Sequence, residues 1–184
     1  MRMSAGIFAL ALLAGLLPAT ASPQVESTPI PATKKPNFAS MNFLVGTWTC
    51  STRSARRPAP YVTTSTYSLD PSGYWISETS TTAKAPWIPQ ALTISDKYTY
   101  DPDAHRWVDV TYGDLGAYGL SYSSGWNGNR ISWHDIGFVP SPDISSQTDT
   151  VVTKVSDTKT TSASSFTERK TGRHVSVNGV CTKH

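Results

Sequence analysis

Carboxylates within strand-like segments are the side chains of this sequence best suited to chemistry. Glu78 lies in YWISETSTT, Asp109 in RWVDVTY and Asp135 in RISWHDIGF, whereas most other acidic residues lie in turns, where they bond their own backbone. A carboxyl group that is buried beside a cavity keeps its proton to higher pH and suits proton transfer. Each of the three is either such an interior group or, as is more common, an exposed residue of a strand.

Other patterns of catalytic or metal-binding residues are missing from the sequence. It contains no Gly-x-Ser-x-Gly nucleophile elbow, and no Cys, His, Asp and Glu residues have the spacing of metal ligands. His105 lies in a turn, His134 alternates with Trp133 and is expected to face outward, and His184 is the last residue. We therefore predict no catalytic residue beyond a possible carboxylate and no metal site.

Aromatic residues are the stronger indication of a binding site. The sequence has 6 Trp, 8 Tyr and 5 Phe, many of them in segments that also carry Ser and Thr. Such side chains would either line a cavity with apolar walls and hydroxyl groups or fill the interior, and both interpretations stay open. The predicted ligand-binding residues are Tyr67, Trp75, Tyr98, Tyr112, Tyr122 and Trp133.

Three arginines lie at the end of the first strand-like segment and in the loop after it. They are Arg53, Arg56 and Arg57. If this loop borders the mouth of a cavity, the positive charge favours an anionic ligand. An ordinary solvated loop is the alternative, and the more common one.

The N-terminal residues have the features of a signal peptide. Arg2 precedes the apolar run Ala5–Leu17, which is too short to span a bilayer comfortably, and Ala19–Ala21 supplies small residues for cleavage. We predict a protein exported to the periplasm or secreted, and an uncleaved anchor is the alternative. The predicted division is 1–21 as signal peptide, 22–40 as a disordered lead-in rich in Pro, Ser and Thr, and 41–184 as the folded domain.

The charge of the chain argues against a nucleic-acid partner. There are 16 Lys and Arg and 13 Asp and Glu, a formal net charge of +3, and removal of Arg2 with the signal peptide leaves +2. A nearly neutral chain without a dense basic stripe lacks the footprint of nucleic-acid binding. We expect a small-molecule partner and no membrane insertion after cleavage, and the oligomeric state stays open.

Short segments that alternate between apolar and small polar residues indicate strands. Turn signals such as Asp70–Gly73 and Asn127–Asn129 separate them, and Pro86 and Pro89 exclude a central strand between two of them. The segment FASMNFL is expected to form one helical turn that plugs an end. Segments such as TTSASSFTE have little apolar area on either face, which favours a closed barrel over a sandwich. We predict an all-β fold, an antiparallel up-and-down barrel of about 8–10 strands.

Cys50 and Cys181 are the two cysteines. In an exported protein an even number is typical of a disulfide, which here would stabilise the fold by about 4–5 kcal/mol in the chain-entropy model. Two reduced, buried thiols are the alternative. The first and last strands of an even-stranded barrel run antiparallel, so two residues late in their strands meet only if the first strand is longer than expected or the C-terminal tail crosses the barrel end.

The segment FLVGTWTC, Phe43–Cys50, resembles the Gly-x-Trp signature in the first strand of the calycin superfamily, which comprises lipocalins, fatty-acid-binding proteins and nitrobindin-like barrels. The segments YDPDAHRWV and SSGWNGNRISW are similar to hairpins of bacterial lipocalin-like proteins of unknown function. The resemblance implies a lipocalin-like barrel in which Gly46 allows close approach to a neighbouring backbone. Trp48 would close one end, with its N–H bonded to backbone and with Arg169 or Arg173 over its ring.

The same resemblance raises the question of haem. Nitrobindin-like barrels hold haem through a His near the start of a late strand, and His174 occupies a comparable place. Against this, His174 lies on the face opposite Val175, and Cys50 and Thr52 stand where that family continues with glycines. We therefore predict no haem and no other cofactor.

The leading functional prediction is noncovalent binding of a small, partly apolar ligand inside the barrel, and the question of enzymatic activity stays open. One alternative is a barrel enzyme, an isomerase or hydrolase that uses a buried carboxylate. The other is a packed envelope protein that acts through its surface. A cavity would favour binding, a buried Glu78 or Asp109 beside it would favour catalysis, and a filled interior would favour the surface role.

Overall fold

The computed structural model describes residues 34–138, 144–147 and 149–184. The compact unit formed by these residues runs from Lys34 to His184, so it begins earlier than the expected boundary at Met41. The reason is Phe38, which is buried in the hydrophobic core. The signal peptide predicted for 1–21 and most of the lead-in predicted for 22–40 lie outside the described residues.

One short 3-10 turn and twelve strands make up the unit. In chain order they are η1 (Asn42–Leu44), β1 (Gly46–Ser54), β2 (Tyr61–Leu69), β3 (Ile76–Thr82), β4 (Leu92–Asp101), β5 (Arg106–Gly113), β6 (Tyr118–Ser123), β7 (Trp126–Asn127), β8 (Arg130–Phe138), β9 (Ile144–Gln147), β10 (Thr150–Ser156), β11 (Lys159–Glu168) and β12 (His174–Lys183). Within the described ranges, no helix has the length and apolar character needed to cross a membrane.

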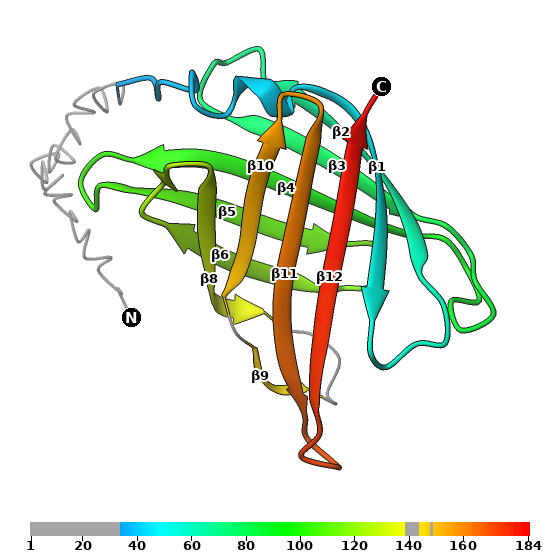
Figure 1. Cartoon of the computed structure of the whole chain (residues 1–184). Helices are drawn as coiled ribbons and strands as arrows, with labels where there is room; N and C mark the ends of the chain where they lie inside the picture. The colour runs from blue at the N-terminus through cyan, green and yellow to red at the C-terminus, as the bar shows by residue number, and fades with distance from the viewer. Residues whose placement is uncertain (1–33, 139–143, 148) are drawn as a thin grey trace, which may run out of the picture. The chain divides into compact units, whose positions relative to one another are not determined.

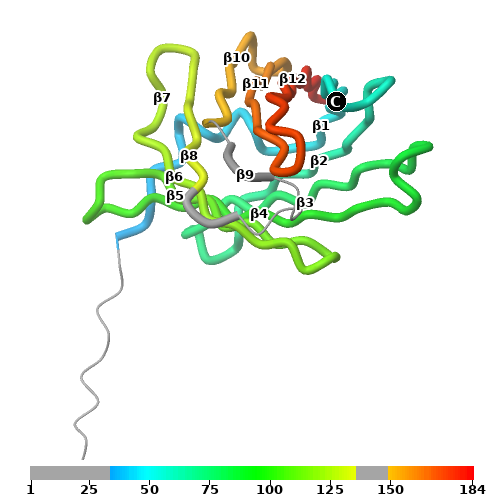
Figure 2. Tube along the Cα trace, turned by 90° about the horizontal axis from the view of Figure 1, so that it is seen from below, coloured from blue at the N-terminus to red at the C-terminus, as the bar shows by residue number. Residues whose placement is uncertain are grey.

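Ten of the strands form a closed antiparallel barrel. Neighbours in the sheet are β1 to β6 in order, then β8, β10, β11 and β12, and β12 pairs with β1 to complete the ring. β7 extends the ladder beside β8, and β9 pairs with β11. Strands β10 to β12 and β1 lie on one side and β3 to β6 on the other (Figures 1 and 2). This confirms the prediction of an all-β barrel of about ten strands.

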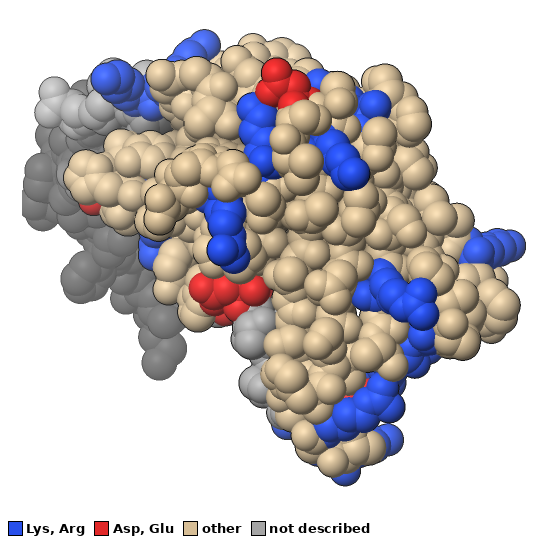
Figure 3. Space-filling model, viewed as in Figure 1, with Lys and Arg blue, Asp and Glu red and all other residues tan. Residues whose placement is uncertain are grey.

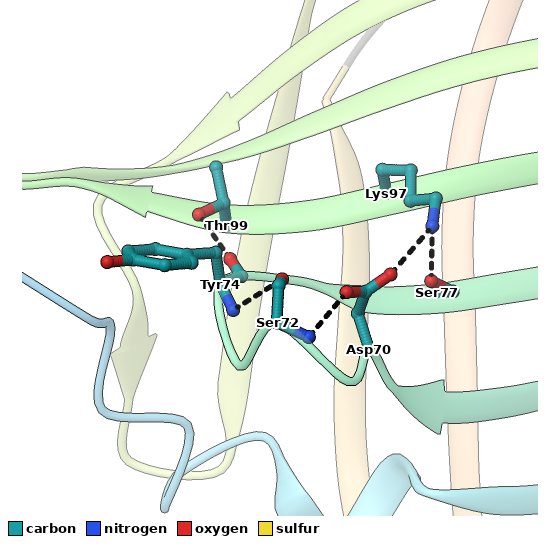
Figure 4. Close-up of polar contacts among 6 residues, drawn as sticks. All are labelled: Asp70, Ser72, Tyr74, Ser77, Lys97 and Thr99. Atoms are coloured by element: carbon teal, nitrogen blue, oxygen red, sulfur yellow. Dashed lines mark hydrogen bonds and ion pairs between the residues drawn. The ribbon is translucent and has the colours of Figure 1, made fainter. Parts of the chain in front are cut away.

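The turns lie where Pro, Gly and Asn predicted them. Between β2 and β3, Asp70 accepts a hydrogen bond from the Ser72 N–H at 2.9 Å, and the Gly73 N–H donates to the Asp70 carbonyl at 2.8 Å. Lys97 and Thr99 of β4 fasten this turn to the neighbouring strand (Figure 4). Hydrogen bonds from Ser72 lower the pKa of the Asp70 carboxyl.

A second predicted turn joins β7 and β8. Asn127 pairs with Arg130 across it. Gly128 there adopts a φ of 61°, a conformation that glycine enters without steric cost.

Alternating residues of each strand face the barrel interior, but the tyrosines of β5 and β6 do not face inward. Trp107 and Asp109 face inward on β5, and Ser121 and Ser123 on β6, while Tyr112 is 51% exposed. The large rings of Trp107, Trp133 and Tyr98 already occupy this part of the interior, so the facing residues on β6 have to be small.

The turn before β1 and the first strand close one end of the barrel. Met41 is 2% exposed and packs in the core, as expected for a plug. Trp48 is also 2% exposed, and its Nε1–H donates to the Leu44 carbonyl at 2.7 Å. This agrees with the structural role expected for Trp48.

The basic residue beside Trp48 is Lys183, which corrects the expectation that Arg169 or Arg173 covers the ring. Lys183 Nζ lies 5.8 Å from the Trp48 ring centroid and donates to the Phe43 carbonyl at 2.9 Å. Arg173 lies at the other end of β12, where its guanidinium donates to the Ala55 carbonyl at 2.7 Å.

The close approach at Gly46 also involves Lys183. A Cβ on Gly46 would lie 2.8 Å from Lys183 Cε, and Gly46 has a φ of 126°. The positive φ is what requires glycine here, and the close neighbour is the flexible Lys183 side chain rather than a neighbouring backbone.

Cys50 and Cys181 form a disulfide between β1 and β12, with their Cα atoms 4.0 Å apart. They are direct partners in the ladder, in which Trp48 pairs with Lys183 and Ser54 with Val177. The first residues of β12 extend beyond the end of β1, because tilted strands in a barrel are staggered. This stagger, and not a tail that crosses the barrel end, brings a late residue of β12 to the middle of β1.

The disulfide closes a loop of sequence separation 131, so its removal should destabilise the fold strongly. We expect the variant with both Cys50→Ser and Cys181→Ser to lose about 4 kcal/mol of unfolding free energy in urea titrations. Its far-ultraviolet circular dichroism should stay that of the parent. The reduced parent is the control and should unfold at the same urea midpoint as the variant. If the variant and the reduced parent both unfolded at the midpoint of the oxidised parent, the prediction would be wrong.

Candidate functional site

Four carboxylates face the barrel interior, on β3, β4, β5 and β8. They belong to two rows of laterally paired residues that cross the inner wall. The first row is Tyr67, Glu78, Asp96 and Thr111, and the second is Tyr98, Asp109, Ser121 and Asp135. Because one inward face carries all eight side chains, the acidic groups lie near one another and near two phenols.

Hydrogen bonds hold Glu78 in place. Tyr98 Oη donates to Oε2 and Ser80 Oγ donates to Oε1, each at 2.6 Å. Ser65 lies 2.6 Å from Ser80 and, because the Ser80 proton is already given to Glu78, Ser65 is the donor in this contact. Burial raises the pKa values of the Tyr67 and Tyr98 phenols well above the usual range, and the nearby Glu78 charge adds to the effect. Both phenols therefore remain hydrogen-bond donors at physiological pH.

Asp96 and Asp109 hold their protons more tightly than ordinary carboxyl groups. Burial raises the pKa of Asp96, and the adjacent Glu78 raises it further, although Thr111 donates a hydrogen bond of 2.6 Å. Burial, followed by the charges of Asp96 and Glu78, raises the pKa of Asp109 to about 8. Asp109 Oδ1 is buried and accepts no hydrogen bond from the part of the chain that the structure describes. A proton on Asp109 therefore relieves its repulsion with Asp96 and Glu78.

Two small cavities adjoin these rows inside the barrel. The acidic cavity has a volume of about 240 Å³ and is lined by Asp109, Asp135, Ser121 and the ring of Trp133. The aromatic cavity, of about 190 Å³, lies toward the closed end, and Met41 is part of its wall. Tyr98, Trp133 and Val152 line both, so the two cavities are neighbours.

A cavity of about 500 Å³ lies at the open end of the barrel, and we call it the mouth cavity. Inward-facing residues at the ends of the strands form its floor, and the β1–β2, β3–β4 and β5–β6 loops form its rim. Its apolar wall comprises Ile88, Leu92, Ile94, Leu115, Phe166 and Val177, and its polar or amphipathic wall includes Ser54, Arg56, Arg57, Tyr61, Trp87 and Gln90.

Three of the six predicted ligand-binding aromatics face the interior. Tyr67, Tyr98 and Trp133 line the aromatic cavity. Tyr112 faces outward, and Tyr122 packs on the outer surface against His134, with ring centroids 5.1 Å apart.

The sixth aromatic residue, Trp75, is half-buried in the turn before β3 and lines none of these cavities. The candidate haem ligand His174 is exposed at the start of β12. Among the described residues, no three Cys, His, Asp or Glu side chains are arranged to hold a metal ion.

Sequence reasoning missed Asp96 and Trp87. Asp96 lies two residues from Ile94 and two from Tyr98, so all three share the inward face of β4. This spacing was the available signal. Trp87 lies between two prolines in the β3–β4 loop, so strand periodicity gave no information about the direction of its side chain.

Comparisons with known proteins carry no argument about the fold or the ligand of this chain. No protein-family model matches the chain, and no curated protein does. One solved structure that resembles it is described as EF1p2_mFAP2b bound to DFHBI, with 12% sequence identity and a TM-score of 0.37, over 78% of this chain and 95% of that chain. At this similarity the comparison carries no argument about what this chain binds.

The raised pKa of Asp109 predicts how stability depends on pH. The unfolded chain releases this proton near the ordinary value of 3.8, and the folded protein near 8, so this group stabilises the fold at low pH and that stability is lost as the pH rises through about 8. We expect the free energy of unfolding of Asp109→Asn to be about 1–3 kcal/mol higher than that of the parent at pH 9, and nearly the same as that of the parent near pH 4. Urea titrations across this range measure the difference.

The matched control is Asp103→Asn, in the exposed turn between β4 and β5. It should follow the parent at every pH. If Asp109→Asn also followed the parent, Asp109 would not be a proton-retaining group of the folded protein.

Proposed function

We propose that this protein is an exported, calycin-like barrel that binds a small, partly apolar molecule in the mouth cavity. The observation that carries the proposal is the volume of that cavity, about 500 Å³. Binding sites for small molecules are usually clefts of roughly 300–1,000 Å³ with mainly apolar walls and a few polar groups. The proposal includes no cofactor.

The walls of the mouth cavity suit a ligand with an apolar body. Ile94, Phe166 and Val177 present aliphatic and aromatic surface from three different strands, and covering this surface with a ligand removes it from water. Tyr61 and Gln90 supply polar groups at the same wall, where they would orient the ligand.

The other two predicted functions are less well supported. A packed envelope protein has no need for a cavity of this size. An enzyme that uses a buried carboxylate is favoured by one observation, the position of Asp109 in the wall of the acidic cavity. The Asp109→Asn variant also tests this second candidate, because any activity that depends on proton transfer by Asp109 would be lost in it while Asp103→Asn retained it.

Export is part of the proposal. The Cys50–Cys181 disulfide supports it, because disulfides persist in oxidising compartments. The features of the N-terminal residues support it further.

Binding is tested with a neutral fluorescent probe, N-phenyl-1-naphthylamine, whose emission rises in apolar sites. The parent should bind it with a saturable increase in fluorescence. Val177→Trp fills part of the mouth cavity, so the affinity should fall about tenfold or more.

The matched control is Val180→Trp on the same strand, because Val180 faces outward and is 44% exposed. It should bind the probe as the parent does, and thermal unfolding should show that both variants are folded. Equal affinities of the two tryptophan variants would contradict binding in the mouth cavity.

Export is tested by N-terminal sequencing of the mature protein from its own organism. Cleavage after Ala21 predicts a chain that starts at Ser22 and is recovered outside the cytoplasm. Recovery of the full chain from the cytoplasm would contradict it.

A further inference from the structure

We propose that the ligand of the mouth cavity is an amphipathic organic anion, with its charged group bound by Arg57 and Trp87 and its apolar body against the inner ends of the strands. The inference rests on the binding function proposed above and adds the chemical class of the ligand. The shared chemistry is a single anionic group, such as a carboxylate, on a short apolar body.

Two hydrogen-bond donors in the wall of the mouth cavity have no acceptor. Trp87 Nε1 is buried and donates to no atom of the described chain. Arg57 is half-buried in the same wall and makes no ion pair with any residue in the described ranges. A buried donor without an acceptor costs free energy. A ligand that brings an anionic acceptor would remove this cost for Trp87 Nε1 and would give Arg57 an ion-pair partner.

The neighbouring arginine has a different role. Arg56 Nε lies 3.2 Å from Glu168 Oε1, which ties the β1–β2 loop to the end of β11. Glu168 is thereby engaged by Arg56, and Arg57 lies on the tied loop. Arg57 also acts on Tyr61: burial raises the pKa of this phenol, and the positive charge of Arg57 partly offsets the rise. This places the guanidinium near the wall that Tyr61 forms.

The open end of the barrel is basic. Lys and Arg side chains gather over the β1–β2 loop and the β11–β12 hairpin (Figure 3). We call this group the basic collar, and it consists of Arg53, Arg56, Arg57, Arg169, Lys170 and Arg173. Positive charge around a concave site raises the local concentration of anions and speeds their association.

The interior sets the orientation of the ligand. Along β4, Ile94 lines the mouth cavity and the next inward-facing residue is Asp96. Glu78 pairs with Asp96 across β3 and β4. Asp109 lies on β5, two residues from Thr111, which is the β5 partner of Asp96. Burial, and then repulsion among these carboxyl groups, raises the pKa values of Asp96 and Asp109. An anionic group that moved past Ile94 would add to this repulsion, so it stays at the collar. An organic cation would be repelled at the mouth, because the positively charged basic collar surrounds the entrance.

The experiment compares two probes with the same alkyl chain, decanoate and decanol, as competitors of N-phenyl-1-naphthylamine on the full mature protein at pH 7.4. We expect decanoate to displace the probe at about tenfold lower concentration than decanol, and its advantage to shrink as salt is added. If the site prefers neutral or cationic ligands, decanol should displace the probe at the same concentration as decanoate or at a lower one, whatever the salt concentration.

Two variants assign the effect to residues. Arg57→Gln should weaken decanoate about tenfold to a hundredfold and leave decanol unchanged, as expected for loss of a hydrogen bond to a charged group. Trp87→Phe keeps an aromatic ring and removes the N–H, so it should weaken decanoate about threefold to tenfold and decanol little. Arg53→Gln is the matched control, because Arg53 belongs to the collar but is exposed and lies outside the cavity wall.

The outcomes separate the two proposals. If the naphthylamine probe binds and Arg57→Gln loses no more affinity for decanoate than Arg53→Gln does, the anion inference is wrong and binding in the mouth cavity stands. If neither the naphthylamine nor decanoate binds the folded parent, the binding function is wrong and the inference falls with it.

Discussion

Closure of the sheet is the constraint on which the rest of the structure depends. The ladder from β1 to β12 becomes a ring because β8 pairs with β10 over Trp133–Arg130 and Thr150–Thr153, and because β12 pairs with β1. A closed ring satisfies the backbone groups of its ten strands without an exposed edge. It therefore tolerates strands such as β11, which is rich in Ser and Thr and would bury too little apolar area in an open sheet.

The ring also explains why the core is confined to part of the barrel. Phe38, Met41, Trp107, Ile131 and Trp133 form a cluster toward the closed end. Toward the mouth the interior side chains are smaller, more polar or half-buried, and they leave a space of about 500 Å³. The proposed binding site is thus the space that remains where closure of the ring, and not side-chain packing, holds the strands in place.

Charge divides the cavity system along the barrel axis. The mouth carries arginines, the middle carries the four carboxylates, and the closed end carries aromatic rings. Each of the carboxylates Glu78, Asp96 and Asp109 raises the cost of a charge on its neighbours. This arrangement leaves the mouth as the place where an anionic group is favoured, and it gives the middle the capacity to hold protons.

The sequence predicted the features that local chemistry determines. Turn residues placed Asp70–Gly73 and the β7–β8 hairpin, and the cysteine count predicted the disulfide. The resemblance to calycins implied the burial of Trp48. The faces of β5 and β6 could not be predicted in this way.

The faces of β5 and β6, the basic residue beside Trp48 and the position of Trp87 depend on distant parts of the chain. Which face turns inward is set by the volume that Trp107 and Trp133 occupy, and not by the hydrophobicity of Tyr112 or Tyr122. Strand stagger selected Lys183 in place of Arg173 beside Trp48. The conformation of the β3–β4 loop brings Trp87 to the mouth, and no periodic pattern in the sequence predicts that conformation.

The most direct test of the account is to map a bound ligand on the assigned amide spectrum of the protein. Titration with decanoate, followed by nitrogen–proton correlation spectra, reports which backbone amides sense the ligand. The account predicts the largest shifts in residues 54–61 and 82–94, which border the mouth cavity. Shifts centred on the closed end around Trp48, or on the outer face of β5 and β6, would contradict it.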